Sequence, residues 1–82
     1  MDVAVVGTGY VGLVTGTCLA EIGHRVICVD SNASKIEFLK QGQIPIFEPG
    51  LDDLVHRNVA AKRLSFTTHL PDAVNQSEII FI

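Results

Sequence analysis

The stretch VAVVGTGYVG, residues 3–12, decides the fold of this chain. It begins with an apolar run typical of a buried strand, and three glycines follow with the spacing GxGxxG. Each glycine has a mechanical reason: Gly7 allows a tight turn, Gly9 lets a ligand approach the main chain, and Gly12 lets a helix pack closely. The pattern therefore predicts a strand that turns directly into a helix.

The rest of the chain alternates between candidate strands and candidate helices. We expect strands at Val3–Val6, Arg25–Val29, Leu64–Thr67 and Glu78–Ile82, and helices at Tyr10–Ile22, Ala33–Lys40, Leu51–Lys62 and Pro71–Asn75. Short unbroken apolar runs are typical of parallel strands that are buried on both faces. We therefore expect an α/β protein with a partial Rossmann fold, in which a parallel sheet of strand order 3-2-1-4 carries helices on both faces.

An acidic residue, Asp30, ends the second apolar run, 18 residues after Gly12 and close to the spacing of ~20 expected in dinucleotide-binding units. A carboxylate at this place accepts hydrogen bonds from ribose hydroxyls and repels a 2′-phosphate, while the start of the helix receives the diphosphate. Ser31 and Asn32 follow, without an arginine, so the residues favour NAD over NADP. An ordinary glycine turn, with Asp30 as a strand-end or cap residue, stays open as the alternative.

The composition describes one small globular domain. The chain has 82 residues, 48% of them hydrophobic, and a net charge of −3, which gives no reason to expect nucleic acid or an anionic membrane as partner. We find no signal peptide and no apolar run near the ~20 residues of a membrane span, so we expect a cytoplasmic location. The last run, residues 78–82, looks like a central strand, so we expect residues 1–82 to be the N-terminal part of a longer NAD-binding domain.

Cysteines and histidines give no sign of a metal site or a disulfide framework. Cys18 and Cys28 lie in a predicted helix and strand, and we expect both to be buried, reduced thiols. Val11, Val14, Cys18 and Ile22 form a second apolar line along the predicted helix, beside a line of small residues at Gly12, Gly16 and Ala20. The histidines have no metal-ligand spacing, and we expect them at the surface or beside strands.

The sequence resembles the nucleotide-sugar dehydrogenases, the family that oxidises UDP-glucose, UDP-sugar amides or GDP-mannose. The stretch VVGTGYVGL, residues 5–13, resembles the N-terminal fingerprint of the family. The stretch PIFEPGL, residues 45–51, is far more specific and resembles the UDP-glucose 6-dehydrogenase branch. Residues 78–82 resemble the fourth strand of the family, so the resemblance covers essentially the whole chain.

The resemblance implies a two-step oxidation of the C6 alcohol of UDP-glucose to UDP-glucuronate, with reduction of two NAD. It also implies that the cysteine nucleophile and its lysine, asparagine and aspartate partners lie beyond position 82, and that this chain alone is inactive. The parent protein would bind the UDP-sugar and form a homodimer through a central helix. A non-enzymatic NAD-sensing module is the alternative, although the proline loop favours the dehydrogenase.

The resemblance also implies which residues contact the cofactor. They are Gly7, Gly9, Tyr10, Val11 and Gly12 at the diphosphate, Asp30 at the ribose, and Lys35 on the adenosine side. Lys35 could instead be a solvated lysine in the first turn of its helix. Glu48 could line the cleft or simply belong to the start of the next helix, and Thr67 and Thr68 are further candidates near the cofactor.

Overall fold

The computed structural model describes residues 1–45 and 48–82, and it contains four strands and four helices. In chain order they are β1 (Asp2–Val6), α1 (Tyr10–Glu21), β2 (Arg25–Val29), α2 (Ala33–Lys40), α3 (Leu51–Ala60), β3 (Leu64–Thr67), α4 (Leu70–Asn75) and β4 (Ile79–Phe81). The strands are parallel and lie in the order β3-β2-β1-β4. The predicted α/β fold and strand order are confirmed, and the ends of the elements lie within two residues of the predicted ones.

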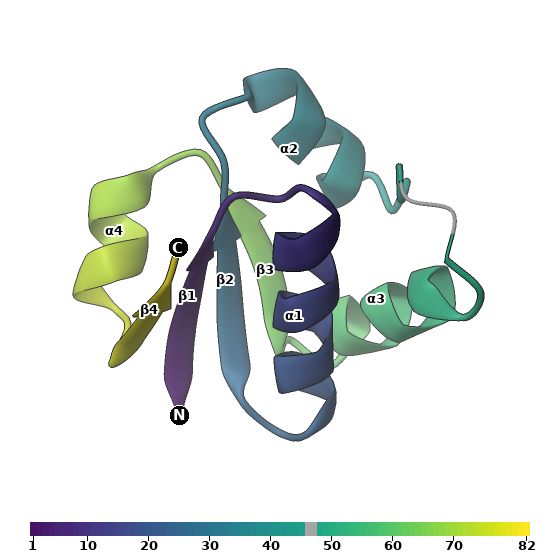
Figure 1. Cartoon of the computed structure of the whole chain (residues 1–82), viewed down its shortest axis with the longest axis horizontal. Coiled ribbons are helices and arrows are strands. Elements are labelled where there is room, and N and C mark those ends of the chain that lie inside the picture. The colour runs from purple at the N-terminus through teal and green to yellow at the C-terminus, as the bar shows by residue number, and fades with distance from the viewer. Residues whose placement is uncertain (46–47) are drawn as a thin grey trace.

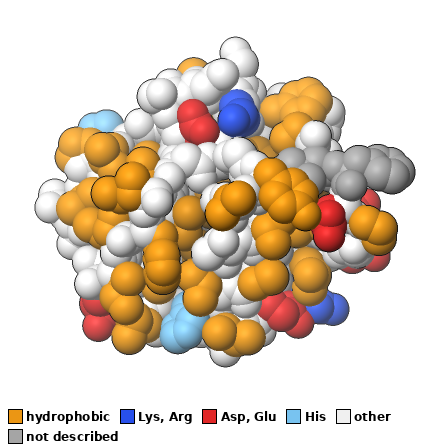
Figure 2. Space-filling view, in the orientation of Figure 1, with side chains coloured by type: hydrophobic (Ala, Val, Ile, Leu, Met, Phe, Trp, Pro, Cys, Tyr) orange, Lys and Arg blue, Asp and Glu red, His pale blue; other side chains and the backbone are white. Residues whose placement is uncertain are grey.

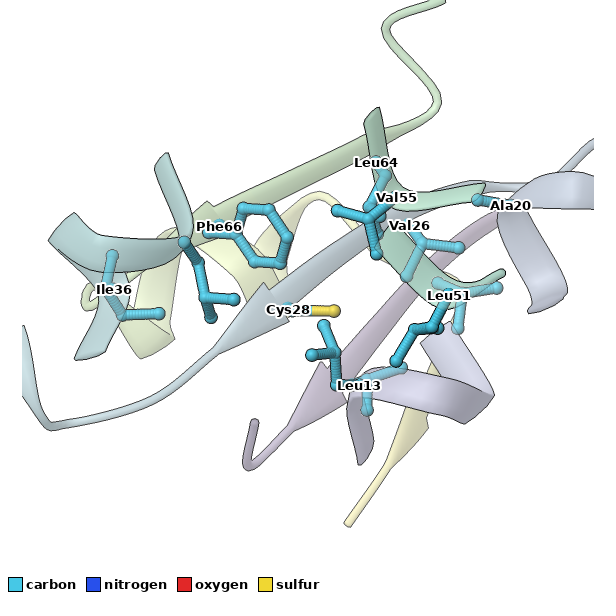
Figure 3. Packing of buried hydrophobic residues seen from close by; sticks show 12 residues of the cluster. Leu13, Ala20, Val26, Cys28, Ile36, Leu51, Val55, Leu64 and Phe66 are labelled. Carbon is cyan, nitrogen blue, oxygen red and sulfur yellow. The ribbon is translucent and has the colours of Figure 1, made fainter. Parts of the chain in front are cut away.

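Helices cover both faces of the sheet (Figure 1), as predicted. On one face, side chains of α1, α2 and α3 pack against alternate residues of the strands in one large apolar cluster, seen in Figure 3. On the opposite face, Ala73 of α4 packs against Ala4 and Val29 in a smaller cluster. The alternation of side chains along a strand explains how neighbouring residues reach opposite clusters.

Small residues bring α1 close to the sheet. A Cβ atom at Gly16 would lie 2.8 Å from the sulfur of Cys28, a contact that real Cβ atoms do not make. Ala20, one turn further along, is fully buried. The line of small residues is therefore the face of α1 that packs on β1 and β2.

Of the second apolar line, only Val14 packs against the core, and the other three residues face solvent. Val11 and Ile22 are 74% and 72% exposed, and Cys18 is exposed as well, so the prediction that Cys18 is buried is wrong. The face of α1 that packs on the sheet instead carries Leu13, Gly16, Thr17 and Ala20, which are all buried. Cys28 is buried as predicted, and its burial raises the pKa of the thiol to about 12.

The proline-containing segment leads from α2 into α3. Ile46 and Phe47, which belong to the predicted apolar loop, lie outside the described residues. Gly50 adopts a left-handed conformation with φ of 83° and directly precedes α3 at Leu51. Pro49 therefore lies in the turn before the helix. Within the described ranges, no helix is long and apolar enough to cross a membrane.

Candidate functional site

The candidate site lies at the carboxyl ends of β1 and β2. Because the strands pair in register, with Val6 opposite Val29, the glycine turn after β1 and Asp30 after β2 lie side by side. β1 also marks the point where the strand order reverses, since β2 pairs on one side of it and β4 on the other. In open α/β sheets, ligands bind in the crevice at this point.

Gly7 and Gly12 are required by the turn itself. Gly7 has a φ of 102°, which side-chain-bearing residues rarely adopt, and its N–H donates a hydrogen bond of 2.6 Å to the carbonyl oxygen of Val29. A Cβ atom at Gly12 would overlap the carbonyl oxygen of Gly7. Both glycines therefore allow the chain to reverse tightly between β1 and α1.

Gly9 has no such requirement from the protein. Its φ of −70° and ψ of −170° suit any residue, and a Cβ atom there would find no protein atom within 4 Å. The space beside its backbone is open to a ligand. This is the arrangement expected where a phosphate group approaches the main chain closely.

The N-terminus of α1 presents unpaired N–H groups to the same space. The helix begins at Tyr10, after Gly9, and within the described part of the chain no side chain caps it and no acidic residue lies in its first turn. Free N–H groups and the positive end of the helix dipole together favour a bound anion. The turn and the helix start therefore suit a diphosphate, and the residues present fit a dinucleotide.

Two cavities lie on either side of the turn. The first, of about 440 Å³, lies between the turn, α1 and the end of β4, and we call it the β4-side cavity. It is lined by Val5, Val6, Gly7, Gly9, Tyr10, Val11, Gly12, Thr15, Phe81 and Ile82. The second, of about 230 Å³, is the Asp30-side cavity, which is lined by Val6, Gly7, Val29, Asp30, Ser31, Thr68 and Leu70. Two cavities that meet at an anion-binding turn suit a ligand with two halves joined by phosphates.

Asp30 is held at the mouth of the second cavity by three hydrogen bonds. Its Oδ1 accepts one of 3.0 Å from the N–H of Asn32, and its Oδ2 accepts two from Thr8, of 3.0 Å from the N–H and 2.7 Å from the hydroxyl. These bonds, first that of Asn32 and then those of Thr8, lower the pKa of Asp30 to about 2. The carboxylate is therefore ionised at any physiological pH.

Lys35 lies beside Asp30, with its Nζ atom 3.7 Å from Oδ2. It belongs to the first turn of α2, where Asn32 caps the helix by accepting a hydrogen bond from the N–H of Lys35. Its side chain is also 36% exposed, so the ammonium group contacts both solvent and the carboxylate. Lys35 thus forms an ion pair with Asp30 and also remains partly solvated.

Tyr10 and Glu48 connect the glycine turn to the segment before α3. The hydroxyl of Tyr10 donates a hydrogen bond of 2.9 Å to Oε2 of Glu48, and this bond raises the pKa of the tyrosine. The two residues are 38 positions apart, and nothing in the sequence pattern indicated the contact. Glu48 thus reaches the edge of the β4-side cavity through Tyr10, and its carbonyl oxygen also accepts a hydrogen bond from Leu51 at the start of α3.

Of the two remaining threonine candidates, one lines the Asp30-side cavity and the other does not. Thr68 lines the Asp30-side cavity, whereas the hydroxyl of Thr67 accepts a hydrogen bond from the N–H of His69. Among the residues that the structure describes, no three His, Cys, Asp or Glu side chains gather as they would around a metal ion. Thr8 is the site residue that sequence reasoning missed, because its position inside the glycine motif carries no signal of its contact with Asp30.

Comparisons with known proteins agree with this geometry. The model of the UDP-glucose/GDP-mannose dehydrogenase family, NAD binding domain, matches residues 1–82. The UDP-glucose 6-dehydrogenase TuaD of Bacillus subtilis is 60% identical over 98% of this chain, and the UDP-glucose 6-dehydrogenase of Rhizobium meliloti is 57% identical over all of it. The chain spans 17% and 19% of the length of these two relatives.

Solved structures share the same fold. The GDP-mannose dehydrogenase of Pseudomonas aeruginosa, solved as a ternary complex, superimposes on the whole chain with a TM-score of 0.95 at 44% identity. The UDP-glucose dehydrogenase of the archaeon Pyrobaculum islandicum covers 98% of the chain with a TM-score of 0.91 at 40% identity. The chain corresponds to 19% and 18% of these two proteins.

Proposed function

This chain belongs to the UDP-glucose/GDP-mannose dehydrogenase family, by its NAD-binding domain, and from that premise we propose that it is the N-terminal part of a UDP-glucose 6-dehydrogenase. The parent enzyme oxidises the C6 alcohol of UDP-glucose to UDP-glucuronate and reduces two NAD. The 60% and 57% identity to proteins named UDP-glucose 6-dehydrogenase supports this substrate over GDP-mannose, whose dehydrogenases are 42–44% identical.

In this proposal the glycine turn and the start of α1 bind the diphosphate of NAD. Two observations support the binding of the diphosphate here. The backbone is open at Gly9, and N–H groups are free at Tyr10, Val11 and Gly12. The adenosine half lies at the Asp30-side cavity, and the nicotinamide half lies toward the β4-side cavity. Gly7 acts through the turn, which it allows the chain to make.

Asp30 reads the adenosine ribose and selects NAD over NADP. Its carboxylate, with a pKa of about 2, remains negatively charged at the point where a 2′-phosphate would have to lie. Lys35 forms an ion pair with the same carboxylate. The residues that follow Asp30, Ser31 and Asn32, are uncharged and so supply no further positive charge to bind a 2′-phosphate. The site therefore accepts hydrogen bonds from the ribose hydroxyls of NAD and repels the 2′-phosphate of NADP.

The chemistry of the reaction requires residues beyond this chain. The glycine turn and Asp30 would hold NAD, which would supply the hydride acceptor: one NAD molecule for the oxidation of the alcohol to the aldehyde, and a second for the oxidation of the aldehyde to the carboxylate, whose second oxygen would come from water. Neither cysteine of this chain suits the covalent step: Cys28 is buried with a thiol pKa of about 12, and Cys18 lines neither of the two cavities. We infer that these 82 residues bind and orient NAD, and that a homodimeric, cytoplasmic parent enzyme supplies the substrate site.

The proposal is tested by the stoichiometry of NADH formation. The full-length protein is expected to form two NADH for each UDP-glucose consumed and to react far more slowly with GDP-mannose, whereas the 82-residue chain forms none. NAD binding without any sugar-nucleotide-dependent reduction would contradict the enzymatic function and favour an NAD-sensing module. A higher rate with GDP-mannose would overturn the choice of substrate alone.

A further inference from the structure

We propose that Thr8 is a positioning residue that fixes the carboxylate of Asp30 for the recognition of NAD and the rejection of NADP. The proposal rests on the function proposed above and assigns a role to a residue inside the glycine motif that is not itself a glycine. Thr8 would act through Asp30 and would not touch the dinucleotide.

The geometry of Thr8 is that of a clamp on a single oxygen atom. Thr8 is 1% exposed, and both its N–H and its hydroxyl donate to Oδ2 of Asp30, at 3.0 and 2.7 Å. Two donors from one rigid turn residue fix the position of Oδ2, and the N–H of Asn32 fixes Oδ1 at 3.0 Å. The carboxylate plane is therefore set before any ligand arrives.

The number of acceptor sites shows which oxygen is left for the ribose. A carboxylate offers about four lone-pair sites, two on each oxygen. Thr8 occupies both sites of Oδ2, while Asn32 occupies one site of Oδ1. Oδ1 thus keeps one free site, and because Asp30 lines the Asp30-side cavity, a ribose hydroxyl bound there could donate to it.

Loss of the Thr8 hydroxyl would change this arrangement in a specific way. Oδ2 would keep the N–H donor but lose its shortest bond, which is a charge-assisted O–H···O⁻ bond. The carboxylate could then rotate away from the ribose. NAD would bind more weakly, because part of the binding free energy would be needed to bring the carboxylate back into its orientation. The repulsion of a 2′-phosphate would also weaken, because the charge would no longer be held against it.

The chain provides a matched control in Thr17. Like Thr8 it is a fully buried threonine, but its hydroxyl oxygen has no hydrogen-bond partner among the described residues. Thr17→Val therefore makes the same chemical change as Thr8→Val without removing a bond to Asp30. Thr8→Ser keeps the hydroxyl and serves as the rescue variant, and Thr8→Ala removes the hydroxyl without the added methyl group of valine.

The experiment measures Kd for NAD and NADP by calorimetric titration, with KM and kcat alongside, on the full-length protein and these four variants. Thr8→Val and Thr8→Ala are expected to raise Kd and KM for NAD about tenfold, with kcat unchanged, and to lower the ratio of Kd for NADP to Kd for NAD. Thr8→Ser and Thr17→Val should stay within about twofold of the wild type. Thermal melting shows which variants are folded. If Thr8→Val does not fold, Thr8→Ala tests the loss of the hydroxyl instead.

Two results would overturn the proposal while leaving the proposed function intact. One is wild-type affinity for NAD in both hydroxyl-deleted variants. The other is an equal loss of affinity in Thr17→Val, which would mean that any change to a buried threonine of this region acts through packing. Failure of the wild-type protein to bind NAD would instead overturn the proposed function, and this proposal with it.

Discussion

Gly9 and Gly12 lie three residues apart in one turn, but the structure needs them for different reasons. Gly12 lies against the carbonyl oxygen of Gly7, so a side chain there would force the turn apart. Gly9 has ordinary backbone angles and open space beside it. Gly12 is therefore needed for folding, whereas Gly9 leaves space for a bound ligand.

This difference predicts a much larger loss of stability for a substitution at Gly12 than at Gly9. Gly12→Ala is expected to lower the free energy of unfolding by about 3 kcal/mol, because backbone atoms must move to accept the methyl group. Gly9→Ala should lower it by less than about 1 kcal/mol, the effect of a poorer residue before a helix. Urea unfolding of the two variants measures both changes, and equal losses would contradict the separation of roles.

Asp30 is expected to stabilise the fold in a pH-dependent manner. Its pKa is lowered from 3.8 to about 2 in the folded chain, so its contribution is fully present above about pH 4 and disappears as the pH falls through about 2. Asp30→Asn should cost about 2 kcal/mol at pH 7 and much less near pH 2. Urea unfolding across this pH range is the measurement, with exposed Asp53→Asn as the control.

A difference between wild type and Asp30→Asn that stays constant from pH 7 to pH 2 would contradict this prediction. It would mean that the charge of the carboxylate does not matter and that the variant acts through packing. The control variant should show a small change, because Asp53 is exposed in the first turn of α3.

At the scale of elements, a buried polar residue joins α3 to the end of α1. Asn58 is fully buried, and its side-chain amide donates to Oε1 of Glu21 at 3.0 Å and to the carbonyl oxygen of Leu54 at 2.8 Å. Its side-chain oxygen accepts a bond of 2.9 Å from Nε of Arg63. Both the amide and the oxygen of this side chain thus have partners, and the bond to Glu21 joins α3 to the end of α1.

Removal of this side chain is expected to loosen the contact between α1 and α3. Asn58→Ala should cost about 3 kcal/mol of unfolding free energy, because it removes the three hydrogen bonds of a fully buried side chain and leaves a cavity in its place. Asn75→Ala, at the exposed end of α4, should change stability by less than about 0.5 kcal/mol. Thermal unfolding of the two variants compares them, and similar losses would contradict the structural role of Asn58.

The secondary structure could be predicted because its signals are local. Short apolar runs mark β1, β2 and β4, and alternating apolar and polar residues mark β3. Asn32 caps α2 by a hydrogen bond to a residue three positions away. The strand order could be predicted from the glycine motif, because this motif is typical of the doubly wound fold, in which the first four strands lie in the order 3-2-1-4. The orientation of α1 was harder, since the line of larger apolar residues looked equally suitable for burial, and only the close approach at Gly16 decides between the two lines.

The candidate site could be predicted only in part. The glycines and Asp30 follow a known spacing, and the structure brings them together. The clamp of Thr8 on Asp30 and the bond from Tyr10 to Glu48 join residues 22 and 38 positions apart. No periodicity connects such pairs, so their contacts appear only when the strands and loops are placed in space.

At the scale of the whole molecule, the β4 edge of the sheet is apolar and open. Ile79, Ile80 and Phe81 of β4 are each 40–43% exposed. Figure 2 shows hydrophobic side chains gathered over the part of this face where β4 and β1 run in Figure 1. Apolar strand edges of this kind pair readily with other chains.

We therefore expect the isolated 82-residue chain to self-associate through β4. Sedimentation velocity should show a mass that rises with concentration, and Phe81→Lys should shift the distribution toward the monomer. Phe38→Lys is the matched control, because Phe38 on α2 is 44% exposed, like Phe81 at 43%. A monomer at every concentration, or an equal effect of the two variants, would contradict the assignment of the interface to β4.

The central claim is that the open backbone of the glycine turn receives the diphosphate of NAD. Titration of the full-length protein with NAD, comparing the wild type with Gly9→Ala, tests it most directly. We predict that the alanine methyl group weakens NAD binding by at least about tenfold while the melting temperature of the free protein stays nearly the same. Unchanged affinity in a folded Gly9→Ala variant would place the diphosphate elsewhere and contradict the account.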